Sequence, residues 1–101
     1  MAAFEQTYTF DIAHQSIAYH RFGKGEPVLF IHGITTYSFI WRNIVPFFAE
    51  NYDVIAVDLA GCGESSKNID DSYSLKNHAG MLLKLIDHLD LHNVHLVCHD
   101  V

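Results

Sequence analysis

Three short, mostly apolar runs constrain the fold of this chain more than any other feature. They are Val28 to Ile31, Val54 to Val57 and Val94 to Cys98, and the strand that contains the second run is predicted over Tyr52 to Val57. Apolar runs of this length, with no polar alternation, are typical of strands that are covered on both faces of a parallel sheet. Polar residues and glycine follow each run at once, so we expect three buried strands that end abruptly.

The segments around these runs predict the remaining elements. Thr7 to Ile12 and Ser16 to Phe22 alternate partly between polar and apolar residues, which predicts an antiparallel hairpin at the edge of the sheet. Apolar residues at helical spacing predict a helix over Ser38 to Glu50, which Pro46 must bend or split.

A second helix is predicted after a loop rich in glycine and serine. One apolar face is marked by Leu75, Ala79, Leu82, Leu83, Ile86 and Leu89. Its start has three candidate capping residues, namely Asp71, Ser72 and Ser74.

Strands that alternate with helices imply an α/β fold with right-handed crossovers and a mostly parallel sheet. At 101 residues, with 50% of them hydrophobic, the chain has the size of one domain or of part of one.

Charge and hydropathy exclude several classes of partner. Twelve acidic side chains against six Lys and Arg give a net charge of −6, and the cations form no patch for phosphates. We therefore expect no nucleic acid partner. The apolar runs are far shorter than the roughly 20 residues that span a bilayer, so no membrane helix is expected.

The location and the redox state of the protein follow from two further features. The first residues contain Glu5 and no basic residue before Arg21, which fits neither a secretory signal nor a transit peptide, and cytosol is the expected compartment. Cys62 and Cys98 lie far apart and match no disulfide framework or Cys-x-x-Cys motif, so both are expected to be reduced.

Chemistry in such sheets gathers where the parallel strands end, because the loops converge there. Three segments directly follow the three buried strands: His32-Gly33-Ile34-Thr35, the stretch Asp58 to Ser65, and Cys98-His99-Asp100-Val101.

In this order, these segments resemble the amino-terminal half of the α/β-hydrolase superfamily, from about Ala18 to Val101. His32-Gly33 resembles the loop whose backbone N–H supplies part of the oxyanion hole. Asp58-x-x-Gly61-x-Gly63-x-Ser65 resembles the glycine-rich turn of that family. The resemblance implies that residues 1–101 are the amino-terminal half of one such domain, truncated at the nucleophile elbow.

Within the superfamily, Trp41-Arg42-Asn43-Ile44 is closest to the branch that contains haloalkane dehalogenases and epoxide hydrolases. That branch uses an aspartate nucleophile, and its elbow resembles the final four residues here. The resemblance therefore implies Asp100 as the nucleophile of a hydrolase that forms a covalent alkyl ester. It also implies oxyanion donors at the backbone N–H of Ile34 and of Val101.

His32, Gly33 and His99 are expected to support the site rather than to carry protons. Haloalkane dehalogenases have asparagine and tryptophan as halide donors where this chain has Ile34 and Val101, and epoxide hydrolases have proline in place of Thr35. These departures predict a small, mostly apolar substrate, such as a halide, an epoxide or a related compound, bound beside an apolar wall.

No cofactor or metal is expected. His88, His92 and His95 are spaced like metal ligands, but they lie across a predicted helix end and the start of a strand.

Two alternatives stay open. The first is a non-catalytic ligand-binding or interaction module, or an inactive fragment, in which Asp100 is a relic. The second is an esterase or lyase on the same fold. The catalytic His and acid of an active hydrolase are expected beyond Val101.

Overall fold

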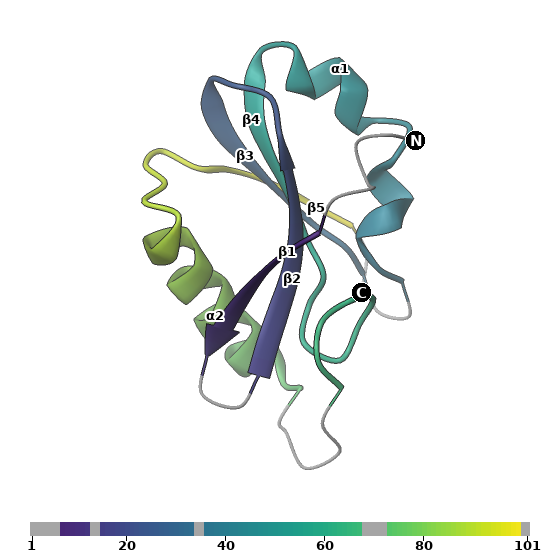
Figure 1. The fold of residues 1–101 in the computed structure, drawn as a ribbon, viewed down its shortest axis with the longest axis vertical. Coiled ribbons are helices and arrows are strands. Elements are labelled where there is room, and N and C mark those ends of the chain that lie inside the picture. The colour runs from purple at the N-terminus through teal and green to yellow at the C-terminus, as the bar shows by residue number, and fades with distance from the viewer. Residues whose placement is uncertain (1–6, 13–14, 34–35, 68–72, 100–101) are drawn as a thin grey trace.

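A computed structural model describes residues 7–12, 15–33, 36–67 and 73–99. The described residues form one five-stranded sheet with the strand order β1-β2-β4-β3-β5 (Figure 1). The strands are β1 (Tyr8–Ile12), β2 (Gln15–Phe22), β3 (Glu26–Ile31), β4 (Tyr52–Val57) and β5 (His95–Cys98).

The pairing directions confirm a mixed sheet. β3 pairs in parallel with both β4 and β5. β2 pairs antiparallel with β1 and with β4, so the amino-terminal hairpin joins the sheet through β2, and β1 is the outer strand. The sequence correctly predicted the α/β class, the hairpin and the three parallel strands, because short apolar runs mark the parallel strands and partial polar–apolar alternation marks the hairpin.

Helices cover the sheet on both sides, as the absence of polar alternation in β3 and β4 predicted. Figure 1 shows α2 (Leu75–His88) on one side and α1 (Val45–Ala49) on the other. Successive strand residues point to opposite faces, so Leu29 and Ile55 face α2, whereas Val28 and Val54 belong to the cluster beneath α1.

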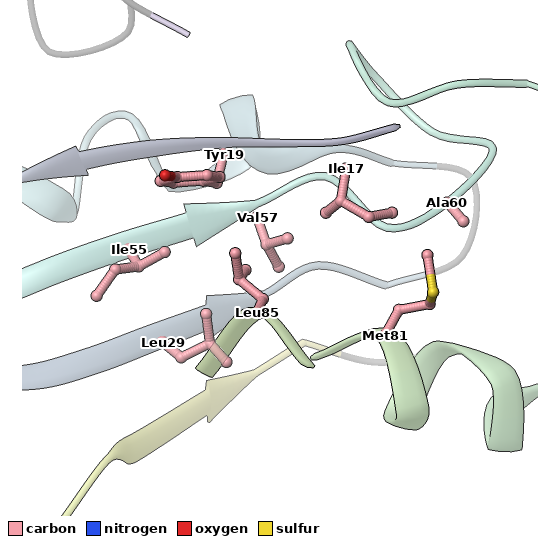
Figure 2. Packing of buried hydrophobic residues seen from close by; sticks show 8 residues of the cluster. All are labelled: Ile17, Tyr19, Leu29, Ile55, Val57, Ala60, Met81 and Leu85. Atoms are coloured by element: carbon pink, nitrogen blue, oxygen red, sulfur yellow. The ribbon is translucent and has the colours of Figure 1, made fainter. Parts of the chain in front are cut away.

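The core on the α2 side joins three strands to the helix (Figure 2). Met81 and Leu85, one helical turn apart, are the buried residues of α2. The buried cluster consists of Ile17, Tyr19, Leu29, Ile55, Val57, Ala60, Met81 and Leu85.

The predicted apolar face of this helix was partly wrong. Leu82, Ile86 and Leu89 pack against the core as expected, but Ala79 is exposed, and Leu75 and Leu83 are 73% and 64% exposed. Because each helical residue turns by about 100°, the face centred on Met81 and Leu85 points Leu83 away from the sheet. Among the described residues, no helix is long and apolar enough to cross a bilayer.

The predicted helix over Ser38 to Glu50 is split. Residues Ser38–Trp41 form a 3-10 helix (η2), and α1 follows after a turn over residues 42–44. Pro46 lies in the first turn of α1, where its missing N–H breaks no helical hydrogen bond. The apolar residues that predicted one helix were Phe39, Ile40, Ile44, Phe47 and Phe48. Because the turn changes the phase of the side chains, three of them are exposed: Phe39, Ile44 and Phe47.

Candidate active site

The carboxyl ends of β4, β3 and β5 lie together at one edge of the sheet. Ile31 is paired with Val57 on one side and with Cys98 on the other, so all three strands end at the same level. The His99 N–H continues this pairing by donating to the Ile31 carbonyl at 3.0 Å. The described parts of the three predicted site segments therefore lie side by side, as the sequence predicted.

The predicted nucleophile and both predicted oxyanion donors lie outside the described residues. These are Asp100, Ile34 and Val101. Their roles stay predictions, and the residues around them define the geometry of the edge.

His32 is buried, and both of its ring nitrogens have partners. Nε2 accepts a hydrogen bond from the Leu59 N–H at 3.0 Å, which joins the loop after β3 to the loop after β4. A backbone N–H can only donate, so the ring proton is on Nδ1, and Nδ1 donates to the Gly33 carbonyl at 2.8 Å. In this arrangement neither nitrogen is free to exchange a proton with a substrate.

The Gly33 carbonyl oxygen is held by two further donors. Thr36 donates to it from Oγ1 at 2.8 Å and from its backbone N–H at 3.3 Å. Three hydrogen bonds to one carbonyl therefore fix the start of the loop that contains Ile34 in the sequence.

Asp58 begins the glycine-rich turn after β4, and its role could not be predicted from the motif alone. Its side chain is fully buried, and its two carboxylate oxygens accept from the N–H groups of Ser38 at 2.7 Å and Glu64 at 2.9 Å. Gly63 has a φ of 50°, and a Cβ atom there would overlap the Asp58 carboxylate. In the sequence, the signal for this contact is an aspartate that precedes a glycine by five residues.

The turn after β4 is also fastened to β2. Ser65 Oγ accepts from the Ala18 N–H at 2.8 Å and donates to the Asp58 carbonyl at 2.6 Å. Ser66 Oγ accepts from the Ser16 N–H at 2.9 Å. These hydrogen bonds fix the turn over residues 58–66 to β2, and the loop after β3 is bonded to this turn through His32.

Trp41 closes the α1 side of this edge. Its ring packs edge-on against Phe30, with centroids 5.0 Å apart, and against His99 at 6.2 Å. Trp41 is buried, and its Nε1 has no hydrogen-bond partner among the described residues. Trp41 is thus part of the core.

Cys62 lies within the turn over residues 58–66 and Cys98 ends β5, whereas the clustered histidines lie apart from this network. Burial raises the pKa of the Cys62 thiol, and the Asp58 carboxylate raises it further, so the thiol stays protonated at neutral pH. The three histidines with ligand-like spacing have separate partners: His88 stacks on Phe10, His92 bonds Asp90, and His95 bonds Glu26.

Comparison with known proteins gives consistent matches to one fold family. A family profile described as alpha/beta hydrolase fold matches residues 26–101. The curated cis-3-alkyl-4-alkyloxetan-2-one decarboxylase of Shewanella oneidensis is 41% identical over 81 residues, which cover 77% of this chain and 26% of that protein. The haloalkane dehalogenase of Agrobacterium fabrum is 42% identical over 78 residues, with 77% of this chain and 25% of that protein covered.

Solved structures give the same result. The crystal structure of a loop variant of a haloalkane dehalogenase from Bradyrhizobium elkanii superposes with a TM-score of 0.87 at 38% identity. The match covers 94% of this chain and 32% of that one. The chain thus spans about a quarter to a third of the length of the proteins that it matches.

Proposed function

Because the chain belongs to the α/β-hydrolase fold family, we propose that it supplies Asp100 as the nucleophile of a hydrolase acting on a small, mostly apolar substrate. One observation carries this proposal. β5 ends at the edge where the loops after β3 and β4 are joined, and Asp100 follows β5 and His99 directly in the sequence. A nucleophile at this edge would share the site with the loop that starts at His32 and Gly33.

The proposed reaction has two steps. A carboxylate oxygen of Asp100 attacks a saturated carbon, a C–O bond forms, and the leaving group departs with the electron pair of the broken bond. Water then adds to the carbonyl carbon of the alkyl ester and gives its proton to a base outside residues 1–101. Collapse of this intermediate releases the alcohol and restores the carboxylate. The sum for a halide is R–X plus water giving R–OH, X⁻ and H⁺.

The backbone N–H groups of Ile34 and Val101 are the proposed donors to the oxyanion that forms in the second step. Preorganised donors of this kind contribute about 3 to 4 kcal/mol each in other hydrolases. His32 and Gly33 would support this loop through the hydrogen bonds described above, and His99 would support the approach to Asp100.

The proposed substrates are haloalkanes, epoxides and related electrophiles. The dehalogenase relatives support this class. The side chains of Ile34 and Val101 carry no hydrogen-bond donor, so they would favour an apolar substrate over strong capture of a halide ion.

A strained cyclic ester is the second candidate substrate. The relative from Shewanella oneidensis is named for an oxetan-2-one, which is a four-membered lactone. Opening such a ring leaves the negative charge on the substrate's own oxygen atoms, so no halide donors are needed. This candidate corresponds to the lyase alternative, and it fits the absence of donor side chains at Ile34 and Val101.

The test compares the full-length protein with its Asp100→Asn variant on a haloalkane, an epoxide and an oxetan-2-one. Mass spectrometry of quenched wild-type protein should find the alkyl group on the peptide that contains Asp100. In a single turnover in ¹⁸O-water, the released alcohol should carry unlabelled oxygen from Asp100, because water attacks the ester carbonyl. The Asp100→Asn variant should form no adduct and should keep its unfolding temperature.

Asp87→Asn is the matched control, since it makes the same chemical change at an exposed position of α2. Full turnover by Asp100→Asn, once deamidation has been excluded, would overturn the proposal. It would favour an esterase or lyase that uses another nucleophile, whereas no turnover of any of the three substrates by the wild-type protein would favour the non-catalytic module in which Asp100 is a relic.

A further inference from the structure

We propose that Asp58 and His32 are positioning residues: they fix Gly33 and Ser38, the two described ends of the segment that follows β3, and so support the N–H donor that the proposed function assigns to Ile34 in the second step of the reaction. The inference rests on the proposed function, because the proposed function assigns an oxyanion donor to this segment. The geometry that carries it comes from the described residues at the two ends.

Both ends of the segment are tied to two consecutive residues of the turn after β4. At the first end, His32 accepts from the Leu59 N–H at 3.0 Å and donates to the Gly33 carbonyl at 2.8 Å. At the second end, the Ser38 N–H donates to Asp58 at 2.7 Å. Neither end can move relative to the turn without breaking one of these hydrogen bonds.

The turn itself is rigid enough to serve as the reference. The second carboxylate oxygen of Asp58 accepts from the Glu64 N–H at 2.9 Å, and Ser65 fastens the turn to β2. Hydrogen bonds to a charged acceptor are stronger than neutral ones, and the complete burial of Asp58 shields them from water.

This arrangement excludes a direct chemical role for Asp58. Its side chain is fully buried, and each of its oxygens already faces a backbone N–H. The carboxylate can therefore act only through the groups that it holds, so we call it a positioning residue.

The two steps of the proposed reaction depend differently on such positioning. In the first step the Asp100 carboxylate loses negative charge, so N–H donors beside it gain nothing. In the second step an oxyanion forms on the former carboxylate, and correctly placed donors stabilise it. A displaced Ile34 N–H should therefore slow ester hydrolysis more than ester formation.

The main variant is Asp58→Asn in the full-length protein. The asparagine amide keeps the size of the side chain, but its NH₂ group must face one of the two backbone N–H donors, so one hydrogen bond is replaced by a repulsive contact between two donors. Ester hydrolysis should fall about 10- to 100-fold, which is less than the 10²- to 10³-fold loss on removing a donor outright. Ester formation should change little, so the covalent adduct accumulates, and kcat and KM fall together.

A pair of His32 variants tests the other end and covers the case in which Asp58→Asn does not fold. His32→Gln keeps an oxygen near the position of Nε2, and so can still accept from Leu59. His32→Asn keeps a group near Nδ1, and so retains only the local bond to Gly33. If the bond between the loops matters, His32→Gln should hydrolyse the ester faster than His32→Asn. Asp87→Asn is again the control with no expected effect.

Two measurements separate failure of this proposal from failure of the proposed function. If both reaction steps slow equally in Asp58→Asn, in proportion to a lower unfolding temperature, the positioning role is wrong. If the wild-type protein forms no ester, the proposed function is wrong, and amide hydrogen exchange then decides on the positioning residues. Faster exchange of the Ser38 and Glu64 N–H groups in Asp58→Asn would support the positioning role of Asp58, whereas unchanged exchange would overturn it.

Discussion

Two histidines near the edge of the sheet differ in how their ring nitrogens are satisfied. His32 has a partner for each nitrogen. His78, on α2, has a buried Nδ1 with no hydrogen-bond partner among the described residues, and its ring lies 6.3 Å from that of Tyr73. Protonation would place a positive charge on a ring whose buried Nδ1 has no hydrogen-bond acceptor among the described residues. We therefore expect protonation of His78 to lower the free energy of unfolding.

The first prediction concerns this pH dependence. Burial lowers the pKa of His78 below its ordinary value of 6.5, and the neighbouring His32 lowers it further. Below pH 6.5 the unfolded state therefore binds a proton that the folded state does not, so the free energy of unfolding falls as the pH falls. The fall ends once folded His78 also binds its proton. His78→Gln, which does not titrate, should flatten this slope in urea melts of the full-length protein across the pH range.

His92→Gln is the control, because it makes the same substitution at a side chain that is 78% exposed. Equal slopes for wild type and His78→Gln would contradict the prediction.

At the scale of elements, the sequence predicted the type and position of the strands and of α2 to within one or two residues. Tyr52 to Val57 is a strand with the predicted ends, and β5 starts at His95 rather than at Val94. Apolar composition and flanking turns decide where a strand lies, and both are local properties. The split between η2 and α1 was less predictable, because the packing of Trp41 and Val45 on the sheet decides where the helix breaks.

The start of α2 is another feature that the sequence left open. Asp71, Ser72 and Ser74 carry the same kind of acceptor, so composition alone could not choose among them. Ser74 is the N-cap in the structure, with its side chain accepting from the Asn77 N–H at 3.1 Å, whereas Asp71 and Ser72 lie outside the described residues. The choice depends on which residue first takes a helical conformation.

The second prediction tests this cap. Ser74→Ala removes the acceptor and should lower the free energy of unfolding by about 1 kcal/mol. Ser74→Asp keeps an acceptor and adds a negative charge at the helix N-terminus, so it should be as stable as the wild type or more stable. Thermal melts of both variants in the full-length protein provide the measurement. A Ser74→Ala protein as stable as Ser74→Asp would show that this hydrogen bond contributes nothing.

Across the whole molecule, the sequence predicted that His32, Asp58 and His99 would lie at one edge, because each follows a parallel strand. It did not predict the hydrogen bonds that join them. Those bonds depend on the register of β3 against β4, which places the Leu59 N–H beside His32, and register is a tertiary property. A buried aspartate held by backbone N–H groups is equally invisible until the chain has folded around it.

Several large apolar side chains of the described residues are exposed on both helices and on β5. β5 pairs only with β3 among the described strands, and Leu96 in β5 is 59% exposed. Phe47 in α1 is 78% exposed, and Leu75 and Leu83 in α2 are also exposed. Both helical layers and the β5 edge therefore present surfaces that would gain stability from a cover.

The third prediction follows from these surfaces: residues 1–101 alone should not form a stable monomer. Full burial of a Leu or Phe side chain contributes about 1.5 to 3 kcal/mol. Leaving Leu96, Phe47, Leu75 and Leu83 largely in water thus forgoes an amount comparable to the roughly 5 to 15 kcal/mol of a typical folded domain. Sedimentation and urea melts should find association or a broad transition for residues 1–101, and a sharper one for the full-length protein. A cooperative transition from a soluble monomer would instead identify an independent module.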